Sequence, residues 1–402
     1  MKRRQKSDRS KYIECLECRR LLSATFARLY SFTNGSDGLT PQAITIDSDG
    51  NLYGTTYQGG DAGGGTVWEL AAGSSAVTTL HSFSGNVYPT GIIVDSEGNL
   101  FGTTKTGGDN SIGSIWELAH GSSTLSPLYS FTGGNDGDYP VGITVGPNGN
   151  LYGVTEFGGD AGVGTVWELP KGSSTISPLS SFTGSDGQYP VGITLDSGGN
   201  LYGTTALGGT DGDGTVWGLG NGESSISALY TFPDVGGSPV YLNGITIDSN
   251  GNLYGATQQG GDNSSGSVWE LDTESDTPST LYSFTGGNDG GGNYGVAIDA
   301  NGDLYGTAEY GGAVGSGVVF AELLPQLSGQ FLGDIPFAAQ PDDTISPDLQ
   351  ITDAPNAGEV VDGDETTVYY LSTTPDLSGV ITPELATNEY DLELGAGESY
   401  NE

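Results

Sequence analysis

The segment Gly50-Asn51-Leu52-Tyr53-Gly54-Thr55-Thr56 decides the fold, because versions of it occur six times along the 402-residue chain. The aromatic residues of the six copies are spaced 48–52 residues apart, at Tyr53, Phe101, Tyr152, Tyr202, Tyr254 and Tyr305. Self-similarity at a fixed period is the signature of a repeat architecture, in which each repeat forms one supersecondary unit.

Three further elements recur in constant order around this one. In the first repeat, the four elements predict strands a (44–47), b (52–56), c (66–70) and d (80–83). Each is short, rich in β-branched and aromatic residues, and bounded by Gly, Asn, Asp or Pro, which is typical of strands. The run Asp47-Ser48-Asp49-Gly50-Asn51 predicts a hairpin turn between strands a and b.

The phase of the repeats predicts how the protein closes on itself. The chain begins with a lone d strand at 29–32, and the last repeat stops after its c strand near Glu322. Together these four strands complete one unit and remove the free edges of an open array. We therefore predict an all-β fold: a six-bladed β-propeller of four-stranded antiparallel blades at 28–323, closed by the N-terminal d strand. The recurring Trp of strand c (Trp68 in the first repeat) is expected to pack between blades.

The charge distribution excludes one class of partner. The net charge is -39, and nine of the eleven Lys and Arg residues lie between Lys2 and Arg28. The acidic remainder repels phosphate backbones, so no nucleic-acid partner is expected. The chain has no run of 18 apolar residues, so no transmembrane helix is predicted. We expect a propeller that is monomeric.

The N-terminal residues resemble a known export motif. Within the basic leader (1–27), Leu16, Glu17, Arg19, Leu21, Leu22, Ser23 and Ala24 fit the LEPR-XLL motif of large exported bacterial proteins, and Cys18 replaces its Pro. The resemblance implies export, so we expect a secreted or cell-surface protein.

The repeats themselves resemble the GloVer-type tandem repeat over residues 29–323. The matching residues of the first copy are Asp37-Gly38 with Pro41, then 50–56, Gly59-Gly60 and 65–68, with Trp68 as the aromatic. The resemblance implies a surface or secreted repeat protein and brings no catalytic residues with it.

The residues after the last repeat form a separate region. Residues 324–347 are interpreted as a linker, and strand-like patterns follow at 348–352, 366–372 and 394–400. The segment 348–402 resembles the front of a CARDB-type Ig-like domain, but it is shorter than the roughly 100 residues of an Ig sandwich. It is also acidic, with no Lys or Arg. Both a partial Ig-like sandwich and a disordered tail therefore remain open.

In an antiparallel meander, the d–a and b–c connections meet at one rim of the ring. The b–c loops there carry a Gly-Gly-Asp pattern, with Asp61, Asp109, Asp160 and Asp262. Clustered carboxylate oxygens suit calcium, so these four residues are candidate Ca²⁺ ligands. Asp beside Gly is also an ordinary turn residue, and this second interpretation requires no metal and no other cofactor.

One position on this rim breaks the repeat. The two residues before each Gly-Gly pair differ from copy to copy while their neighbours stay nearly identical. Variation on a rigid ring is typical of a binding surface, although loop positions also drift without function. The candidate contacts are Tyr57, Phe157 and Tyr310 as aromatic residues, with Lys105 and Glu156 as polar ones. An extracellular carbohydrate or a protein would suit them.

The sequence does not favour an enzyme. The two histidines, His81 and His120, fall in a d strand and in a c–d turn of the opposite rim, so neither can serve carboxylates of this rim as a general base. Glu156 and Glu309 lie three blades apart, which argues against a glycosidase pair. We predict a binding, adhesion or structural module. The alternative is a divalent-cation-dependent propeller enzyme, lactonase-like or lyase-like.

Overall fold

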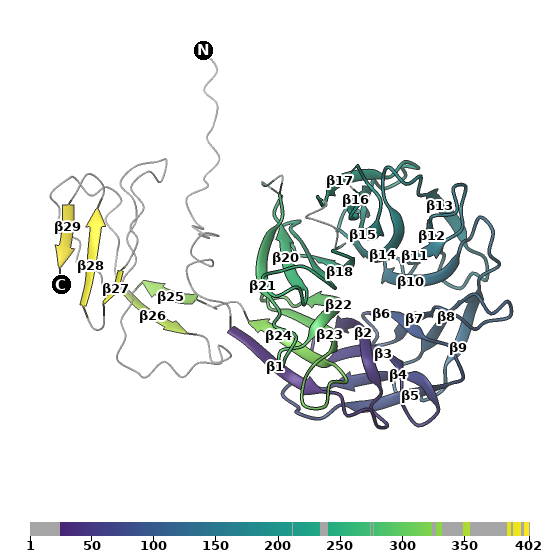
Figure 1. Ribbon diagram of the computed structural model, residues 1–402, viewed down its shortest axis with the longest axis horizontal. Coiled ribbons are helices and arrows are strands. Elements are labelled where there is room, and N and C mark those ends of the chain that lie inside the picture. The colour runs from purple at the N-terminus through teal and green to yellow at the C-terminus, as the bar shows by residue number, and fades with distance from the viewer. Residues whose placement is uncertain are drawn as a thin grey trace, which may run out of the picture. The chain divides into compact units, whose positions relative to one another are not determined.

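The computed structural model describes residues 25–323, other than 211, 234–239, 274 and 276. The span Phe26–Glu322 is one compact unit (Figure 1). Of the second unit, only the backbone of five short strands is described: β25 (Leu327–Phe331), β26 (Leu349–Asp353), β27 (Glu384–Ala386), β28 (Glu389–Leu394) and β29 (Glu398–Asn401). The export motif and the expected strand at 366–372 lie outside the described residues, and the Ig-like domain stays a prediction.

The compact unit consists of six four-stranded antiparallel sheets, as the sequence predicts. Blade 1 contains β2 (Leu39–Ile46), β3 (Leu52–Gln58), β4 (Gly63–Leu70) and β5 (Thr78–Ser84). Blade 2 contains β6 (Pro89–Val94), β7 (Leu100–Thr104), β8 (Ser114–Leu118) and β9 (Ser126–Ser130). Blade 3 contains β10 (Asp138–Val145), β11 (Leu151–Phe157), β12 (Thr165–Leu169) and β13 (Ser177–Ser181). Blade 4 contains β14 (Gln188–Leu195), β15 (Leu201–Leu207), β16 (Thr215–Leu219) and β17 (Ser227–Thr231). Blade 5 contains β18 (Leu242–Ile247), β19 (Leu253–Thr257), β20 (Ser267–Leu271) and β21 (Ser279–Ser283).

Blade 6 joins the two ends of the repeat region and confirms the predicted closure. It contains β22 (Gly291–Ile298), β23 (Leu304–Tyr310) and β24 (Val318–Leu323), with β1 (Thr25–Ser31) paired to the outer side of β24. Phe26 anchors β1, since its ring stacks on Tyr282 and on Phe320 at centroid distances of 4.5 and 5.6 Å. No sheet of the ring is left incomplete in the described residues.

The first strand of every blade lies innermost. β2, β6, β10, β14, β18 and β22 each contact the corresponding strand of both neighbouring blades, so they surround the axis of the ring (Figure 1). Strand b pairs with strand a, and the d strands lie outermost. The start of strand a and the paired end of strand b therefore lie near the axis. In the described part of the chain, no helix is long and apolar enough to cross a membrane.

The recurring Trp packs between blades, as predicted. Trp68 is fully buried with Phe32 of blade 6 and Ile44 of its own blade. Its ring lies over Gly54 of the paired strand, where an added Cβ would be 2.1 Å from the Trp68 Cζ2. This close approach explains the Gly in the middle of strand b, because any side chain there would displace the ring.

Strand a differs from its predicted limits. The first copy was expected at 44–47, but β2 begins at Leu39 and ends at Ile46. Its pairing with β3 shifts register between Pro41 and Ile44, so Pro41 is accommodated at a bulge rather than ending the strand. Strand b is also longer than expected, so Tyr57 and Gln58 belong to β3 rather than to a loop.

Candidate functional site

The d–a and b–c connections lie side by side at one end of the ring. In blade 1, the Gly60 amide donates to the Gly35 carbonyl (3.2 Å), and the Thr66 hydroxyl donates to the Asp37 carbonyl (3.2 Å). The variable positions lie at this end, in the last two residues of strand b or just after it. Register pairs them with the start of the innermost strand, because the Lys105 amide donates to the Tyr88 carbonyl (2.8 Å) and the Gln258 amide to the Tyr241 carbonyl (2.9 Å).

The residues at the start of strand a have an unusual backbone. Five of the six blades have a non-glycine residue there with positive φ, from 45° to 59°: Thr40, Tyr88, Tyr139, Tyr189 and Tyr241. Bulky side chains rarely adopt this conformation, and each costs on the order of 1–3 kcal/mol. Gly292 takes the same place in blade 6 with φ 66°. Tyrosines are therefore held in strained positions beside the variable residues.

Side chains from successive blades contact one another here. Tyr57 of blade 1 stacks on Tyr88 of blade 2, with centroids 4.5 Å apart and planes at 11°. Phe157 of blade 3 contacts Tyr139 of its own blade (5.7 Å) and Tyr189 of blade 4 (5.1 Å). The aromatic residues thus run across four blades.

Polar pairs cross two other blade boundaries. The Lys105 ammonium of blade 2 lies 2.5 Å from the Glu156 carboxylate of blade 3 and 5.9 Å from the centre of the Tyr139 ring. The side-chain amide of Gln258, in blade 5, donates a hydrogen bond to the Glu309 carboxylate of blade 6 at 3.0 Å.

The charges of Glu156 and Glu309 act on the same tyrosines, although the two acids belong to blades 3 and 6. Burial raises the pKa of Tyr57, and the charges of Glu156 and Glu309 raise it further. Burial likewise raises the pKa of Tyr294, and both carboxylates again contribute. Both acids therefore act on the same two hydroxyls. We call the following residues the axial cluster: Tyr57, Tyr88, Lys105, Tyr139, Glu156, Phe157, Tyr189, Gln258, Tyr294 and Glu309.

Four of the five predicted contact residues belong to the axial cluster. The fifth, Tyr310, is 40% exposed, and its ring lies over the backbone of Gly291, where an added Cβ would be 2.6 Å from the hydroxyl. Sequence reasoning missed Tyr88, Tyr139, Tyr189 and Tyr294. The repeated pairs Tyr88-Pro89, Tyr139-Pro140 and Tyr189-Pro190 were the signal for the first three.

The candidate calcium ligands are spread around the ring. Asp61, Asp109, Asp160 and Asp262 are exposed and lie in four different blades. Within the described residues, no three His, Cys, Asp or Glu side chains come close enough together to hold a metal ion. Calcium binding by these loops stays a prediction.

Two other aspartates of this rim, Asp136 and Asp37, accept hydrogen bonds within their own loops. The Asp136 carboxylate accepts hydrogen bonds from the Thr132 amide (2.7 Å) and hydroxyl (2.8 Å), the Gly134 amide (3.1 Å) and the Tyr129 hydroxyl (2.9 Å). Burial opposes ionisation of Asp136, but these bonds outweigh burial and lower its pKa. Asp37 has the same environment.

The a–b turns at the opposite end use aspartate in a similar way. The Asp47 carboxylate accepts from the Asp49 amide, from the Asn51 amide and side chain, each at 2.9 Å, and from the Tyr53 hydroxyl at 3.1 Å. The Asp47–Asn51 run thus forms the predicted turn, and the Asp47 carboxylate is held by hydrogen bonds within it.

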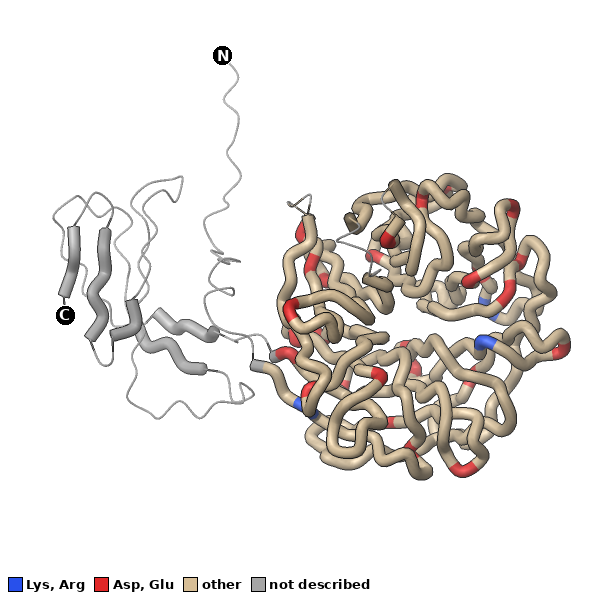
Figure 2. The backbone as a smooth tube through the Cα atoms, viewed as in Figure 1, with Lys and Arg blue, Asp and Glu red and all other residues tan. Residues whose placement is uncertain are grey.

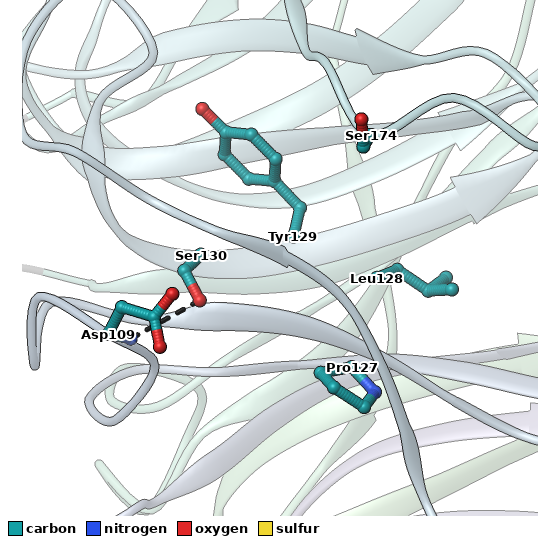
Figure 3. Close-up of a pocket in the computed structure, with 6 residues that line it drawn as sticks. All are labelled: Asp109, Pro127, Leu128, Tyr129, Ser130 and Ser174. Atoms are coloured by element: carbon teal, nitrogen blue, oxygen red, sulfur yellow. Dashed lines mark hydrogen bonds between the residues drawn. The ribbon is translucent and has the colours of Figure 1, made fainter.

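A shallow pocket lies away from the axial cluster, along the outer strand β9. Asp109, Pro127, Leu128, Tyr129, Ser130 and Ser174 line it (Figure 3). The Ser130 hydroxyl accepts from the Asp109 amide (3.3 Å), and the Tyr129 hydroxyl donates to Asp136. The Ser130 and Tyr129 hydroxyls of the pocket are therefore engaged in holding the b–c and d–a loops.

Solved structures share the propeller fold at low sequence identity. A gluconolactonase from Xanthomonas campestris has a TM-score of 0.53 and 14% identity, over 75% of this chain and 90% of the other. A putative oxidoreductase (glucose dehydrogenase) from Thermus thermophilus has 0.51 and 14%, over 74% and 99%. The calcium-binding protein regucalcin from Agrobacterium tumefaciens has 0.50 and 13%, over 75% and 94%. These likenesses show the fold alone.

No curated protein matches the sequence. One family model does, over residues 20–217 and again over 192–324, which together span the whole ring. The match agrees with the resemblance found in the six copies of the repeat. The chain therefore belongs to the Gloeobacter/Verrucomicrobia repeat family.

Proposed function

We propose that the propeller is a binding module, secreted or at the cell surface, whose axial cluster contacts a carbohydrate. The observation that carries the proposal is that a nearly identical framework, repeated six times, presents different side chains at one position of one end. That end brings aromatic rings, two carboxylates, an amide and an ammonium together. The leader's resemblance to an export motif supports the extracellular location.

The composition of the axial cluster supports a sugar ligand. Ligand sites combine aromatic side chains with a few convergent polar groups that fix orientation. Flat aromatic faces at Tyr57–Tyr88 and Phe157–Tyr189 suit the apolar faces of pyranose rings, and Gln258 and Glu309 offer hydrogen bonds to hydroxyls. The strained tyrosines favour a functional role, because strain of this kind persists where the structure gains something from it.

Glycan-array binding tests this proposal. We expect wild-type protein to bind a subset of glycans and the triple variant Tyr57→Ala, Phe157→Ala, Tyr310→Ala to lose at least about tenfold in affinity, or about 1.4 kcal/mol. Leu229→Ala removes a more exposed apolar side chain (49%, against 40% for Tyr310) from the outer strand β17 and is the control. Undiminished glycan binding by the triple variant would sink the assignment of the site.

A second candidate is a divalent-cation-dependent enzyme of the lactonase or lyase kind. The solved propellers named above include a gluconolactonase, and Glu156 and Glu309 act on the same tyrosine hydroxyls. If this candidate is right, lactone turnover is lost after chelation and restored by calcium. Unchanged melting temperature and absent turnover with and without the metal would exclude it.

A further inference from the structure

Two blade boundaries of the axial cluster share a carboxylate that contacts the preceding blade. They differ in the charge of its partner and at the start of strand a, which is Tyr139 in blade 3 and Gly292 in blade 6. Lys105 and Gln258 occupy the same repeat position in blades 2 and 5, immediately after strand b. Glu156 and Glu309 occupy that position in blades 3 and 6. Each carboxylate contacts the residue from the preceding blade, at 2.5 Å for Lys105 and 3.0 Å for Gln258. The ring thus contains two copies of one contact, three blades apart.

In the first copy, the protein supplies its own ammonium ion. The Lys105 Nζ lies between the Glu156 carboxylate and the Tyr139 ring, 5.9 Å from the ring centre. A carboxylate and an aromatic face are together a binding site for an ammonium group. The Lys105 side chain therefore demonstrates that this geometry accepts a primary amine.

In the second copy, the partner is a neutral amide. Gln258 hydrogen-bonds Glu309 but leaves its negative charge in place. The Gln258 side chain also interacts with the Tyr294 hydroxyl, and burial together with the charge of Glu309 raises the pKa of Tyr294. Glu156 cannot compensate, since it is itself an acid and is paired with Lys105. Asp138, in the same end of the ring, has a pKa raised by burial and by the repulsion of Glu156.

The rest of the protein reinforces this local imbalance. Asp and Glu residues are spread around the ring, and Lys and Arg residues are few (Figure 2). Lys171, in the c–d turn of blade 3, lies at the opposite end, where its amide donates to the Asn150 side chain. An acidic surface attracts cations and raises their rate of encounter.

We propose that the Gln258–Glu309 contact binds the free amine of an amino sugar, with the Tyr294 hydroxyl beside it. The ligand's ammonium pairs with Glu309 as the Lys105 ammonium pairs with Glu156, and it shares that carboxylate with the Gln258 side chain. This inference rests on the proposed function, since the aromatic faces of the cluster are what select a sugar over another amine.

Calorimetric titration of the full chain with three hexasaccharides tests the inference. Fully deacetylated glucosamine hexamer is the cationic probe, and its N-acetylated form and cellohexaose are the neutral ones. We expect the deacetylated hexamer to bind at least about tenfold more tightly than either neutral probe. Its affinity should fall as salt is raised, because the attraction is screened.

Two substitutions locate the charge. Gln258→Lys places an ammonium beside Glu309, as Lys105 does beside Glu156. It should lower the affinity for the deacetylated hexamer by at least about tenfold. Ala206→Lys adds the same charge at the same repeat position of blade 4, whose following neighbour is Gln258 rather than a carboxylate. It should weaken binding by less than about threefold, through general charge alone. The melting temperature of each variant confirms that it is folded.

The outcomes separate the two proposals. Equal affinity for charged and neutral hexasaccharides would overturn the amine assignment and leave carbohydrate binding intact. Equal weakening by Gln258→Lys and Ala206→Lys would overturn the location at Glu309. Binding of a lysine-rich peptide without any of the three sugars would overturn both the sugar assignment and the proposed function.

Discussion

Two regions of the ring differ in how closely their residues follow the repeat: the boundaries between blades, and the axial cluster. At each boundary, a Phe of one blade meets a Trp of the next, as in Phe131–Trp167 at 5.8 Å, and only blade 6 departs from this by using Phe320 for the Trp. At the axial end, one position holds Tyr, Lys, Glu, Ala, Gln and Glu in turn. These Phe–Trp contacts are apolar packing, whereas the axial end carries charge, amide and aromatic groups.

This difference shows which residues the closure of the ring constrains. A Trp side chain between two sheets fixes their separation, so six equal boundaries are required to close a ring of six equal blades. That requirement does not extend to the two variable residues before each Gly-Gly pair. The framework therefore leaves those positions free to take side chains that suit a ligand.

Trp167→Ala should have the largest effect on stability. Trp167 is fully buried with Phe131, Ile143 and Leu151, and truncation leaves a cavity at the boundary of blades 2 and 3. We expect a loss of about 3–5 kcal/mol in the free energy of unfolding, measured by denaturant titration.

The matched aromatic substitution at the axial end is Tyr57→Ala. Tyr57 is only partly buried, so we expect a loss well below that of Trp167→Ala. Trp167→Phe is a second substitution to compare with Trp167→Ala, because Phe320 fills the same position in blade 6. The Trp167 indole N–H has no hydrogen-bond partner in the described part of the chain, so Phe removes no hydrogen bond there. If Tyr57→Ala were as costly as Trp167→Ala, the separation between framework and site would be wrong.

Asp136→Ala should have an intermediate effect that depends on pH. Removal of the carboxylate leaves the Thr132 and Gly134 amides without their acceptor, which costs about 1–3 kcal/mol. The folded-state pKa of Asp136 is lowered from 3.8, so its stabilisation is complete above that pH and is lost as pH falls through the lower folded value.

The difference in unfolding free energy between wild type and Asp136→Ala should therefore shrink below about pH 4. Denaturant titrations at pH 7 and pH 3 measure it. Asp61→Ala is the control, since Asp61 is exposed in the b–c loop, and we expect its difference to be small at both pH values. A difference for Asp136→Ala that grows on acidification would contradict the hydrogen-bonding account.

The fold was predictable because its signals are local and repeated. Strand chemistry, turn residues and the position of Trp68 each occur six times or nearly so, and the unpaired d strand at the N-terminus determined the closure. The limits of strand a were not predictable in the same way. Pro41 suggested the end of a strand, and only the pairing of Leu39 with Gln58 shows that the strand continues through a bulge.

The candidate site was predictable in its location and only partly in its members. Variation among near-identical neighbours pointed to Tyr57, Lys105 and Glu156. The tyrosines at the start of strand a are nearly uniform, so they looked like framework, and their positive φ is a property of backbone geometry that no residue pattern displays. The shared influence of Glu156 and Glu309 on Tyr57 and Tyr294 was not predictable, because the number of blades between two residues does not give their closeness to the axis.

Lys105→Gln should have the smallest effect on stability and gives the most direct test of the comparison. It converts the contact of blades 2 and 3 into a copy of the contact of blades 5 and 6, where Gln258 already bonds a carboxylate at 3.0 Å. Both partners of the Lys105–Glu156 pair remain partly exposed, at 31% and 23%, so the ion pair contributes at most about 1 kcal/mol. We expect a loss within that limit in denaturant titrations, and a smaller loss at high salt, because screening weakens the wild-type pair. A loss as large as that of Asp136→Ala would mean that the axial cluster holds blades together, and the distinction between framework and site would fail at this boundary.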